Sequence, residues 1–462
     1  MADLDASFDA IIVGAGQAGP SLAGKLTAAG WTVGFVERQL FGGTCVNVGC
    51  TPTKTLIASA KTAYVARRAK DFGVKVTGEV VVDMRATKER KDAIVARSRD
   101  GIESWLRGMK GCSVFMGTAR FEGLGVMRVG DKLLGAKKFF LNVGCRPSLP
   151  ESLGADKVKH LTSSSILDLD TLPAHLIVVG GSYIGLEFAQ IYRRFGSKVT
   201  VIERGPRLIA HEDEEFSAAV QQLLEAEGIT FRLNANCIHL QQIGEGVSVE
   251  LDCDDEDLEV FGTHVLLAIG RTPNTDDLGL ETIGAAVDEH GYIRVDDELK
   301  TSVEGVWAMG DCNGKGAFTH TAFNDFEIVA ANVLTDERRK VSDRIPCHAL
   351  YIDPPLAHVG MTEAEVRATG RPALVGVRPM TKVGRAVEKG ETFGSMKVLV
   401  DAETRKILGA TIFGVGGDEA IHSILAAMYA KQTADFMTHS MYIHPTVAEL
   451  IPTVFGELKP LA

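Results

Sequence analysis

The sequence predicts an α/β protein in which two βαβ units of one pattern are followed by a C-terminal α+β unit. A strand, a glycine-rich turn, a helix and a second strand succeed one another in residues 9–37, and the same order recurs in residues 174–203. From about residue 346 the pattern changes to short apolar runs, a hairpin at 394–413 and helical stretches. A chain of 462 residues is long enough for several domains with buried cores.

The first unit carries a dinucleotide-binding signature. Gly14-x-Gly16-x-x-Gly19 lies between an apolar strand and a helix, and the second strand ends at Glu37. The glycines let the backbone close tightly on a pyrophosphate at the helix N-terminus, and an acid about 20 residues further on can bind ribose hydroxyls. Because strands frame the motif, we predict a Rossmann-like dinucleotide-binding site here.

The second unit repeats the first in register. Gly180-x-Ser182-x-x-Gly185 and Glu203 lie 166 positions after their counterparts in the first unit. An internal repeat of this kind indicates a second dinucleotide site. Ser182 stands where the first unit has a glycine, but it is still a small residue that can lie against a pyrophosphate.

The acid that ends the second unit favours NADH as the nucleotide. A carboxylate at Glu203 suits the free 2′-hydroxyl of NADH and repels the 2′-phosphate of NADPH. Arg204 and Arg207 follow closely and can offset this repulsion. NADPH therefore stays an alternative.

Two cysteines, Cys45 and Cys50, come just before a helical pattern that runs towards Arg68. A disulfide needs its Cα atoms within about 7 Å, whereas five residues of a regular helix rise about 7.5 Å. If the two bond, Cys45 therefore lies in the irregular entry to the helix and Cys50 in its first turn, where the helix dipole lowers a thiol pKa. A structural disulfide and two unrelated buried thiols are the alternatives.

Charge and composition exclude several classes of function. The net charge of −11 argues against nucleic acid or an anionic membrane as the main partner. No apolar run approaches the length of a membrane span, and the acidic start of the chain carries no basic-then-apolar leader, so we expect a cytoplasmic protein. Apart from the first two, the cysteines show neither zinc-site nor disulfide-framework spacing, and no metal site is predicted. The eight cysteines are at positions 45, 50, 112, 145, 237, 253, 312 and 347.

The segments between these motifs give coarser expectations. Residues 83–110 predict a charged amphipathic helix, and residues 112–143 predict a run of short strands. We expect Cys145 to be a small packing residue rather than a second redox centre, and Cys312 to be a buried, inert thiol.

The segment Gly42-Gly-Thr-Cys45-x4-Cys50-x-Pro-x-Lys54 resembles the active-site motif of the flavin-dependent pyridine nucleotide–disulfide oxidoreductases. That family includes dihydrolipoamide dehydrogenase, glutathione reductase and mercuric reductase, and the resemblance covers essentially the whole chain. It implies that Cys45 and Cys50 form a redox disulfide. Cys45 is then the thiol that attacks substrate, and Cys50 is the thiolate in charge-transfer contact with the flavin. The chain would be an enzyme, an FAD-containing NAD(P)H-dependent oxidoreductase acting on a sulfur group or a metal ion.

The resemblance also assigns the cofactors and their contacts. It places FAD in the first unit and the nicotinamide nucleotide in the second. Lys54 and Glu187 are similar to the ion pair beside the flavin–nicotinamide junction, and Tyr183 is similar to the ring that covers the flavin until nicotinamide displaces it. Asp311 matches the aspartate that binds the ribityl chain. The other cofactor contacts that the motifs imply are Gly43, Thr44, Gly144, Gly270, Arg271 and Thr319.

A second catalytic pair lies near the C-terminus. His444-Pro445-x-x-x-Glu449 resembles the family's acid–base dyad, in which the histidine moves the proton of the outgoing thiol and the glutamate orients it and raises its basicity. We expect a helical pattern that begins at Tyr442 to carry both residues. In the family this histidine reaches the active site of the other subunit. The resemblance therefore implies a homodimer with shared active sites.

These matches predict the domain organisation: two Rossmann-like domains, for FAD and NAD(P), and a C-terminal α+β dimerisation domain. We predict an FAD-binding domain with the redox cysteines at 1–150, an NAD(P)-binding domain at 151–275, the second part of the FAD-binding domain at 276–345 and the dimerisation domain at 346–462.

The electron acceptor is predicted only by class. True mercuric reductases carry a cysteine pair near their C-terminus, and this sequence has no cysteine after Cys347. The segments 51–56 and 354–363 resemble mercuric-reductase-like proteins and the bacterial reactive-chlorine-resistance flavoproteins, which are proposed to reduce copper(II). We therefore expect a small-molecule disulfide or a metal ion as substrate. The alternatives are dihydrolipoamide dehydrogenase, a flavin redox sensor without turnover, and a soluble transhydrogenase.

Overall fold

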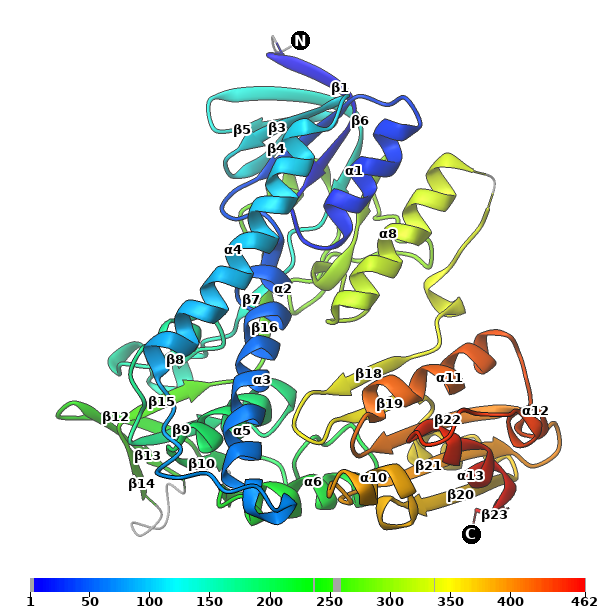
Figure 1. Cartoon of the computed structure of the whole chain (residues 1–462). Helices are drawn as coiled ribbons and strands as arrows, with labels where there is room; N and C mark the ends of the chain where they lie inside the picture. The colour runs from blue at the N-terminus through cyan, green and yellow to red at the C-terminus, as the bar shows by residue number, and fades with distance from the viewer. Residues whose placement is uncertain (1–3, 236, 252–258, 336, 462) are drawn as a thin grey trace.

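A computed structural model describes residues 4–235, 237–251, 259–335 and 337–461. The chain forms three units, and two long helices run side by side from the first unit to the second (Figure 1). Within the described residues, no helix combines the length and the apolar character needed to cross a bilayer.

The first unit is built on a largely parallel sheet. Its elements are β1 Ala6–Val13, α1 Ala18–Ala28, β2 Val33–Glu37, α2 Gly43–Asn47, α3 Cys50–Arg67, α4 Met84–Gly108, β3 Cys112–Met116, β4 Ala119–Gly123, β5 Val126–Val129, β6 Lys132–Leu141, α7 Leu280–Ile283, β17 Val306–Ala308 and α8 Thr319–Leu334. The strand order is β3-β2-β1-β6-β5-β4, and β17, which comes much later in the chain, pairs in parallel with β6. Alternate residues of β1 enter two cores: Ala10 and Ile12 pack with α1 and α8, and Ile11 and Val13 pack on the opposite face.

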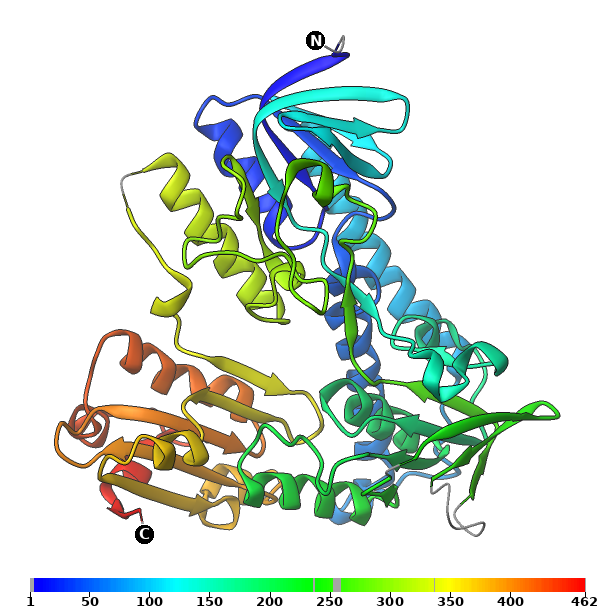
Figure 2. The same cartoon turned by 180° about the vertical axis from the view of Figure 1, so that it is seen from behind.

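The second unit repeats the strand–helix–strand arrangement. Its elements are β7 Cys145–Pro147, β8 Leu161–Thr162, β9 His175–Val179, α5 Tyr183–Phe195, β10 Lys198–Ile202, α6 Glu214–Ala226, β11 Thr230–Arg232, β12 His239–Ile243, β13 Gly246–Glu250, β14 Glu259–Gly262, β15 His264–Leu267 and β16 Arg271–Pro273. The main sheet is parallel, in the order β11-β10-β9-β15-β8, and a small antiparallel sheet of β12, β13 and β14 projects from it (Figure 2). Strands β7 and β16 pair where the chain passes between the two units.

The third unit contains an antiparallel sheet in the order β18-β19-β22-β21-β20-β23. Its elements are β18 Cys347–Leu350, β19 Leu356–Gly360, α9 Glu363–Ala368, β20 Ala373–Pro379, α10 Gly384–Glu388, β21 Ser395–Asp401, β22 Ile407–Phe413, α11 Gly417–Tyr429, α12 Ala434–His439, α13 Ile451–Gly456 and β23 Lys459–Pro460. The predicted hairpin at 394–413 is β21 and β22. Apolar residues of α11 and of the sheet share one core.

The long helices follow their sequence signals. Helix α3 begins at Cys50, and α4 begins after Asp83, whose side chain accepts a hydrogen bond from the Ala86 N–H at 3.0 Å. Leu56 and Ala60 of α3 belong to the core of the second unit. Helix α3 therefore starts beside the first glycine turn and ends packed on the other nucleotide-binding unit.

Two local features of the backbone differ from expectation. Cys45 lies in the short helix α2 rather than in irregular chain, and the path breaks at Val48 and Gly49 before α3 begins. The expected helix from Tyr442 is wrong: the His444–Pro445 peptide is cis, and helical structure begins only at Ala448. A residue that precedes proline is disfavoured in the helical region, which the apolar pattern did not reveal.

Cys237 forms a disulfide, which the cysteine spacing did not predict. Cys253 lies outside the described residues.

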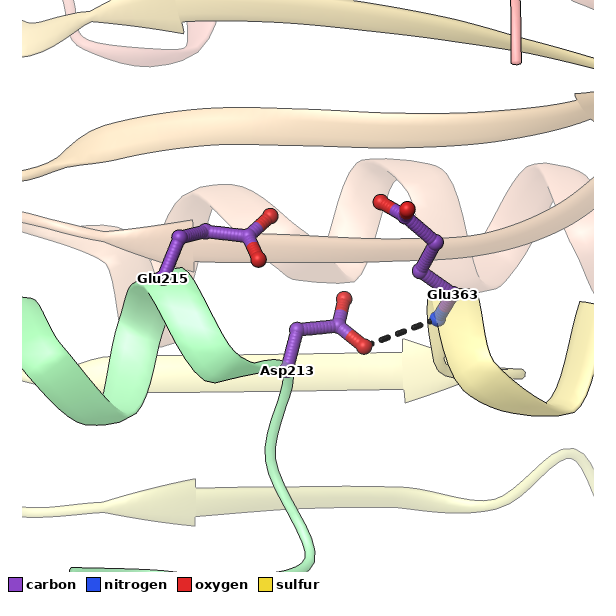
Figure 3. A group of neighbouring side chains, drawn as sticks. All are labelled: Asp213, Glu215 and Glu363. Carbon is purple, nitrogen blue, oxygen red and sulfur yellow. Dashed lines mark hydrogen bonds between the residues drawn. The ribbon is translucent and has the colours of Figure 1, made fainter. Parts of the chain in front are cut away.

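Lys397 joins the second and third units as a buried cation. Asp213 and Glu215, at the start of α6, and Glu363, in α9, lie close together (Figure 3). The Lys397 ammonium lies 2.9 Å from Asp213 and also bonds to Glu215 and Glu363. Burial favours the neutral lysine, but the three carboxylates outweigh it and raise the pKa of Lys397. The cluster is therefore an ion-pair network that links two units.

Removing this cation is expected to destabilise the fold. In Lys397→Met the buried Asp213 carboxylate keeps the hydrogen bond from the Glu363 N–H but loses its cation, so we expect the free energy of unfolding to fall by about 3 kcal/mol, measured by urea and thermal denaturation. The network also holds the pKa of Glu363 below its usual value, against the effect of burial. The Glu363 carboxylate therefore stabilises the fold fully at a pH above its pKa in the unfolded chain. This stabilisation is lost as the pH falls through the lower pKa that the carboxyl has in the folded protein. The exposed Lys389→Met is the control, and equal stability of the two variants would contradict the prediction.

Candidate active site

One cavity of about 830 Å³ collects residues from both nucleotide-binding units. The predicted residues that line it are Gly14, Gly16, Glu37, Gly43, Thr44, Cys45, Cys50, Lys54, Gly144, Ser182, Tyr183, Glu187, Gly270, Arg271, Asp311 and Thr319. Those outside its lining are Gly19, Gly180, Gly185, Glu203, His444 and Glu449. The cavity runs from the first glycine turn and Glu37 to the cysteines and the start of α5.

The two glycine turns have the same backbone geometry. Gly14 and Gly180 have φ values of +102° and +115°, and a Cβ at either position would clash with a carbonyl, that of Asn142 or that of Ala268. Gly19 and Gly185 pack against the carbonyl oxygens of the first glycine in each turn. Glycines outside the cavity lining therefore still shape it, because they let each helix approach its strand.

The acids that end the second strands are held by the turns themselves. One Glu37 oxygen accepts a hydrogen bond from the Ala15 N–H at 2.8 Å and the other from the Gln39 N–H at 2.7 Å. Glu203 accepts from the N–H groups 166 positions after these, at 2.7 and 2.8 Å. The two units that repeat in the sequence therefore also share the hydrogen bonds that hold the acid at the end of the second strand.

The helices that follow the glycine turns keep their first N–H groups available. Neither α1 nor α5 has a side-chain cap or an acidic residue in its first turn, whereas α4 and α9 are capped by Asp83 and Thr362. Uncapped N–H groups at a helix N-terminus bind anions. Together with the glycine turns, these helices fit the pyrophosphates of two dinucleotides.

The two cysteines lie at the entry to α3 as free thiols. Cys50 is exposed to the cavity, and its Sγ lies 3.3 Å from Thr319 Oγ1 at the first residue of α8. The hydrogen bond from Cys45 is the main cause that lowers the pKa of Cys50 to about 6, and the charge of Lys54 acts in the same direction. The same bond, with burial, raises the pKa of Cys45. At neutral pH the pair is therefore a Cys50 thiolate and a Cys45 thiol.

Removing the Cys45 donor is expected to weaken the Cys50 thiolate. In reduced Cys45→Ala we expect the pKa of Cys50 to rise from about 6 towards that of a free thiol, about 8.5. The ultraviolet absorbance of the thiolate, followed against pH, measures it. Cys347→Ala, at a half-buried thiol, is the control. A titration near pH 6 that survives in Cys45→Ala would contradict this assignment.

Lys54 and Glu187 form an ion pair beside the cysteines. The Lys54 ammonium lies 2.8 and 2.7 Å from the two Glu187 oxygens, and the Glu187 side chain is buried. Glu187 also accepts a hydrogen bond from the Tyr351 N–H at 3.0 Å. The pair therefore connects α3, α5 and the start of the third unit at the cavity wall.

Arg271, the first residue of β16 in the second unit, contacts the first unit. Its guanidinium bonds to the Asp311 carboxylate and donates to the Cys145 carbonyl at 2.7 Å. This contact is made possible by the pairing of β16 with β7. Close by, burial raises the pKa of both Cys145 and Cys312 to about 12. The expected burial of the thiols at these two positions is confirmed.

His444 and Glu449 meet each other but not the cysteines. His444 Nδ1 lies 2.8 Å from Glu449 Oε2, and the His444 side chain is 81% exposed. The neighbouring apolar residues Met441 and Ile443 are 98% and 81% exposed. The dyad is therefore complete within one chain, but it lies on an apolar surface outside the cavity.

A second cavity, of about 770 Å³, lies at the far end of α3 and is lined by several arginines. Arg194 is paired with Glu227 and Asp353, and Arg67 and Arg193 donate to backbone carbonyls at helix ends. These arginines are engaged in contacts between helices and between units, so we interpret this cavity as a structural contact region.

Comparison with protein families gives one assignment for nearly the whole chain. The family described as pyridine nucleotide-disulphide oxidoreductase matches residues 8–325, and its dimerisation domain matches residues 347–455. The chain belongs to the pyridine nucleotide-disulphide oxidoreductases. It is therefore an FAD-dependent oxidoreductase that uses NAD(P)H, and its dimerisation domain implies a homodimer.

Relatives with different names match over almost the full length. The probable pyridine nucleotide-disulfide oxidoreductase RclA of Escherichia coli is 32% identical, over 98% of this chain and 99% of RclA. A mercuric reductase of Lysinibacillus sphaericus is 31% identical over 96% of this chain and 81% of that protein. Dihydrolipoyl dehydrogenase 2 of Haloarcula marismortui is 31% identical over 97% and 96%. A solved Cu(II) complex of RclA, described as an HOCl-induced flavoprotein disulfide reductase, superposes with a TM-score of 0.89 at 31% identity and covers 97% of this chain and 99% of RclA.

Proposed function

We propose that this oxidoreductase uses NADH to reduce the Cys45–Cys50 disulfide and passes the electron pair to a small disulfide or a metal ion. The observation that carries the proposal is the position of Cys45 and Cys50, which lie in the cavity that also contains the first glycine turn and the Lys54–Glu187 pair. FAD, when bound, supplies a carrier that accepts a hydride from nicotinamide and delivers two electrons to a disulfide.

We assign cofactor binding and proton transfer to particular residues of the chain. In our proposal Gly14, Gly16 and Glu37 bind the adenosine diphosphate part of FAD, and Asp311, held by Arg271, binds its ribityl chain. Thr319 fixes Cys50 at the cavity wall. Cys45 is a thiol in the reduced pair, because its pKa is raised, and it passes its proton to a base as it attacks the acceptor, since the thiolate is the nucleophile. His444 of the partner subunit exchanges the proton of the outgoing thiol.

Glu203 and its surroundings favour NADH. The Arg207 guanidinium donates to the carbonyls of Glu212 and Ala210 at 3.0 and 2.7 Å, so it is engaged within its own loop. Of the two arginines that can offset the Glu203 charge, only the exposed Arg204 is left to meet a 2′-phosphate. We propose NADH as the electron donor and the reducing cytoplasm as the place of action.

The relatives divide the candidate acceptors into two groups. A mercuric reductase and a Cu(II) complex among the relatives favour a metal ion as the acceptor. The His444–Glu449 dyad suits a thiol product that needs a proton and supports dihydrolipoamide dehydrogenase as the second candidate. A sensor without turnover would need neither a dithiol nor the dyad.

A steady-state assay separates these hypotheses. Purified, FAD-loaded protein is given NADH or NADPH with lipoamide, glutathione disulfide, copper(II) or mercury(II), and nucleotide oxidation is followed by its near-ultraviolet absorbance. We expect oxidation that depends on acceptor and a higher kcat/KM with NADH than with NADPH. Turnover with lipoamide of about 10² s⁻¹ or more would select dihydrolipoamide dehydrogenase. Nucleotide oxidation that no acceptor stimulates would contradict the proposal.

A further inference from the structure

We propose that Glu212, held by His348, positions the Tyr183 ring in the cavity wall and thereby sets the affinity of the enzyme for the nicotinamide ring of its nucleotide. Glu212 and His348 are positioning residues, because they act on the nucleotide through Tyr183. The inference rests on the proposed function and on the role that the family resemblance gives to Tyr183, whose ring covers the flavin until nicotinamide displaces it.

Tyr183 is held at both its ring and its hydroxyl. It is the first residue of α5, directly after the second glycine turn, and it lines the cavity. Its hydroxyl donates to Glu212 Oε1 at 2.5 Å. Its ring makes edge contacts with Phe318 and His348, with centroids 6.2 and 5.7 Å apart. A ring so fixed moves out of the cavity wall only if the hydroxyl releases Glu212.

Glu212 is a buried carboxylate that depends on this contact. Only 2% of the residue is exposed, and Oε1 accepts from both Tyr183 and His348 Nε2, each at 2.5 Å. The other oxygen, Oε2, is buried without a hydrogen-bond partner among the described residues. Burial favours the neutral acid, but His348 and the Tyr183 hydroxyl outweigh it and hold the pKa of Glu212 below its usual value. Because the group is anionic and already lacks one partner, losing Tyr183 is costly.

His348 is itself fixed by the third unit. Its ring stacks between Phe318 and His358, with centroids 5.9 and 5.1 Å away. His358 is buried, and its two ring nitrogens bond to Thr411 Oγ1 at 2.8 Å and to the Gly360 carbonyl at 3.1 Å. The position of Glu212 is thus set by β18, β19 and β22, outside the nucleotide-binding unit that carries Tyr183.

The sequence gives no signal for this arrangement. Glu212 lies in the loop before α6, and His348 is 136 positions further along the chain. Neither belongs to a nucleotide motif. Docking of the third unit on the second brings them together beside Tyr183, which lines the cavity.

A comparison of two nucleotides tests the inference. NAD⁺ carries the nicotinamide ring and ADP-ribose lacks it, so only NAD⁺ requires Tyr183 to move. Calorimetry on the oxidised, FAD-loaded enzyme measures both dissociation constants. In Glu212→Gln a neutral acceptor replaces the charged one, and we expect NAD⁺ to bind about fivefold more tightly with ADP-ribose unchanged. Glu214→Gln, at an exposed position of the same segment, is the control and is expected to change neither.

Two further variants test whether Glu212 acts on NAD⁺ affinity through Tyr183 and His348. Tyr183→Phe removes only the hydroxyl and should tighten NAD⁺ binding by the same factor, with no further gain when it is combined with Glu212→Gln. His348→Phe keeps the stacked ring but removes the second donor to Glu212, so the carboxylate depends more on the Tyr183 hydroxyl and NAD⁺ should bind more weakly, with ADP-ribose unchanged. Equal changes for both nucleotides, unchanged NAD⁺ binding in Tyr183→Phe or His348→Phe, or additive effects would overturn the inference. Failure of the unaltered enzyme to bind either nucleotide would instead contradict the proposed function.

Discussion

Replacing Cys50 by serine is expected to abolish acceptor reduction while NADH still reduces the bound flavin. A serine hydroxyl cannot form a disulfide, so the electron pair has no route from the cavity to a disulfide or metal-ion acceptor. We expect the acceptor-dependent rate to fall by about 10³-fold or more. Stopped-flow absorbance of the flavin and steady-state oxidation of NADH measure the two steps separately.

The matching Cys45→Ser variant makes this result specific. It should lose acceptor reduction equally, but its Cys50 is then a thiolate beside oxidised flavin, because the introduced serine hydroxyl can still donate the hydrogen bond that lowers the Cys50 pKa. A long-wavelength absorbance band should therefore be present before any reductant is added, and it should be absent from Cys50→Ser. Acceptor reduction that survives in Cys50→Ser would favour the transhydrogenase hypothesis, which needs no dithiol.

Loss of His444 is expected to slow turnover by about 10³-fold, the usual contribution of a general acid–base. Glu449→Gln should have a smaller effect, because it removes the charge that raises the basicity of the ring but keeps an oxygen that can accept at the 2.8 Å contact. Since His444 lies on an exposed apolar surface away from the cavity, we expect it to serve the cysteines of a partner subunit.

Mixed dimers test this division of labour between subunits. Cys50→Ser and His444→Ala chains are each inactive, but a heterodimer contains one site with intact cysteines and an intact histidine from the other chain. Co-expression at equal levels should restore about one quarter of the unaltered activity, because half the dimers are mixed and each has one working site. A mixture that stays inactive while gel filtration shows mixed dimers would mean that each chain uses its own histidine.

Several features of the fold were predictable because their signals are local. The two glycine turns, the acids that end the following strands and the register of 166 positions all follow from strand and helix patterns within about 30 residues. The Cys45–Cys50 segment leads into α3 as expected. The domain boundaries at 150, 275 and 345 stay predictions.

Other features were missed because no local pattern encodes them. The path of the chain at His444 depends on a proline whose effect the apolar pattern hid. The disulfide at Cys237 has no spacing signal. Arg271 reaches Asp311 only because two short strands pair where the chain crosses between units.

The sequence by itself determined the two nucleotide-binding units and the place of Cys45 and Cys50 at the entry to α3, because each rests on residues whose spacing along the chain fixes their spacing in the fold. The reaction class followed from the family resemblance of these motifs. Only the tertiary structure decided which residues of separate units contact one another. The Lys397 network and the Tyr183–Glu212–His348 contacts join residues from separate units. Their energies depend on burial at the interface between those units, and burial exists only once the units dock.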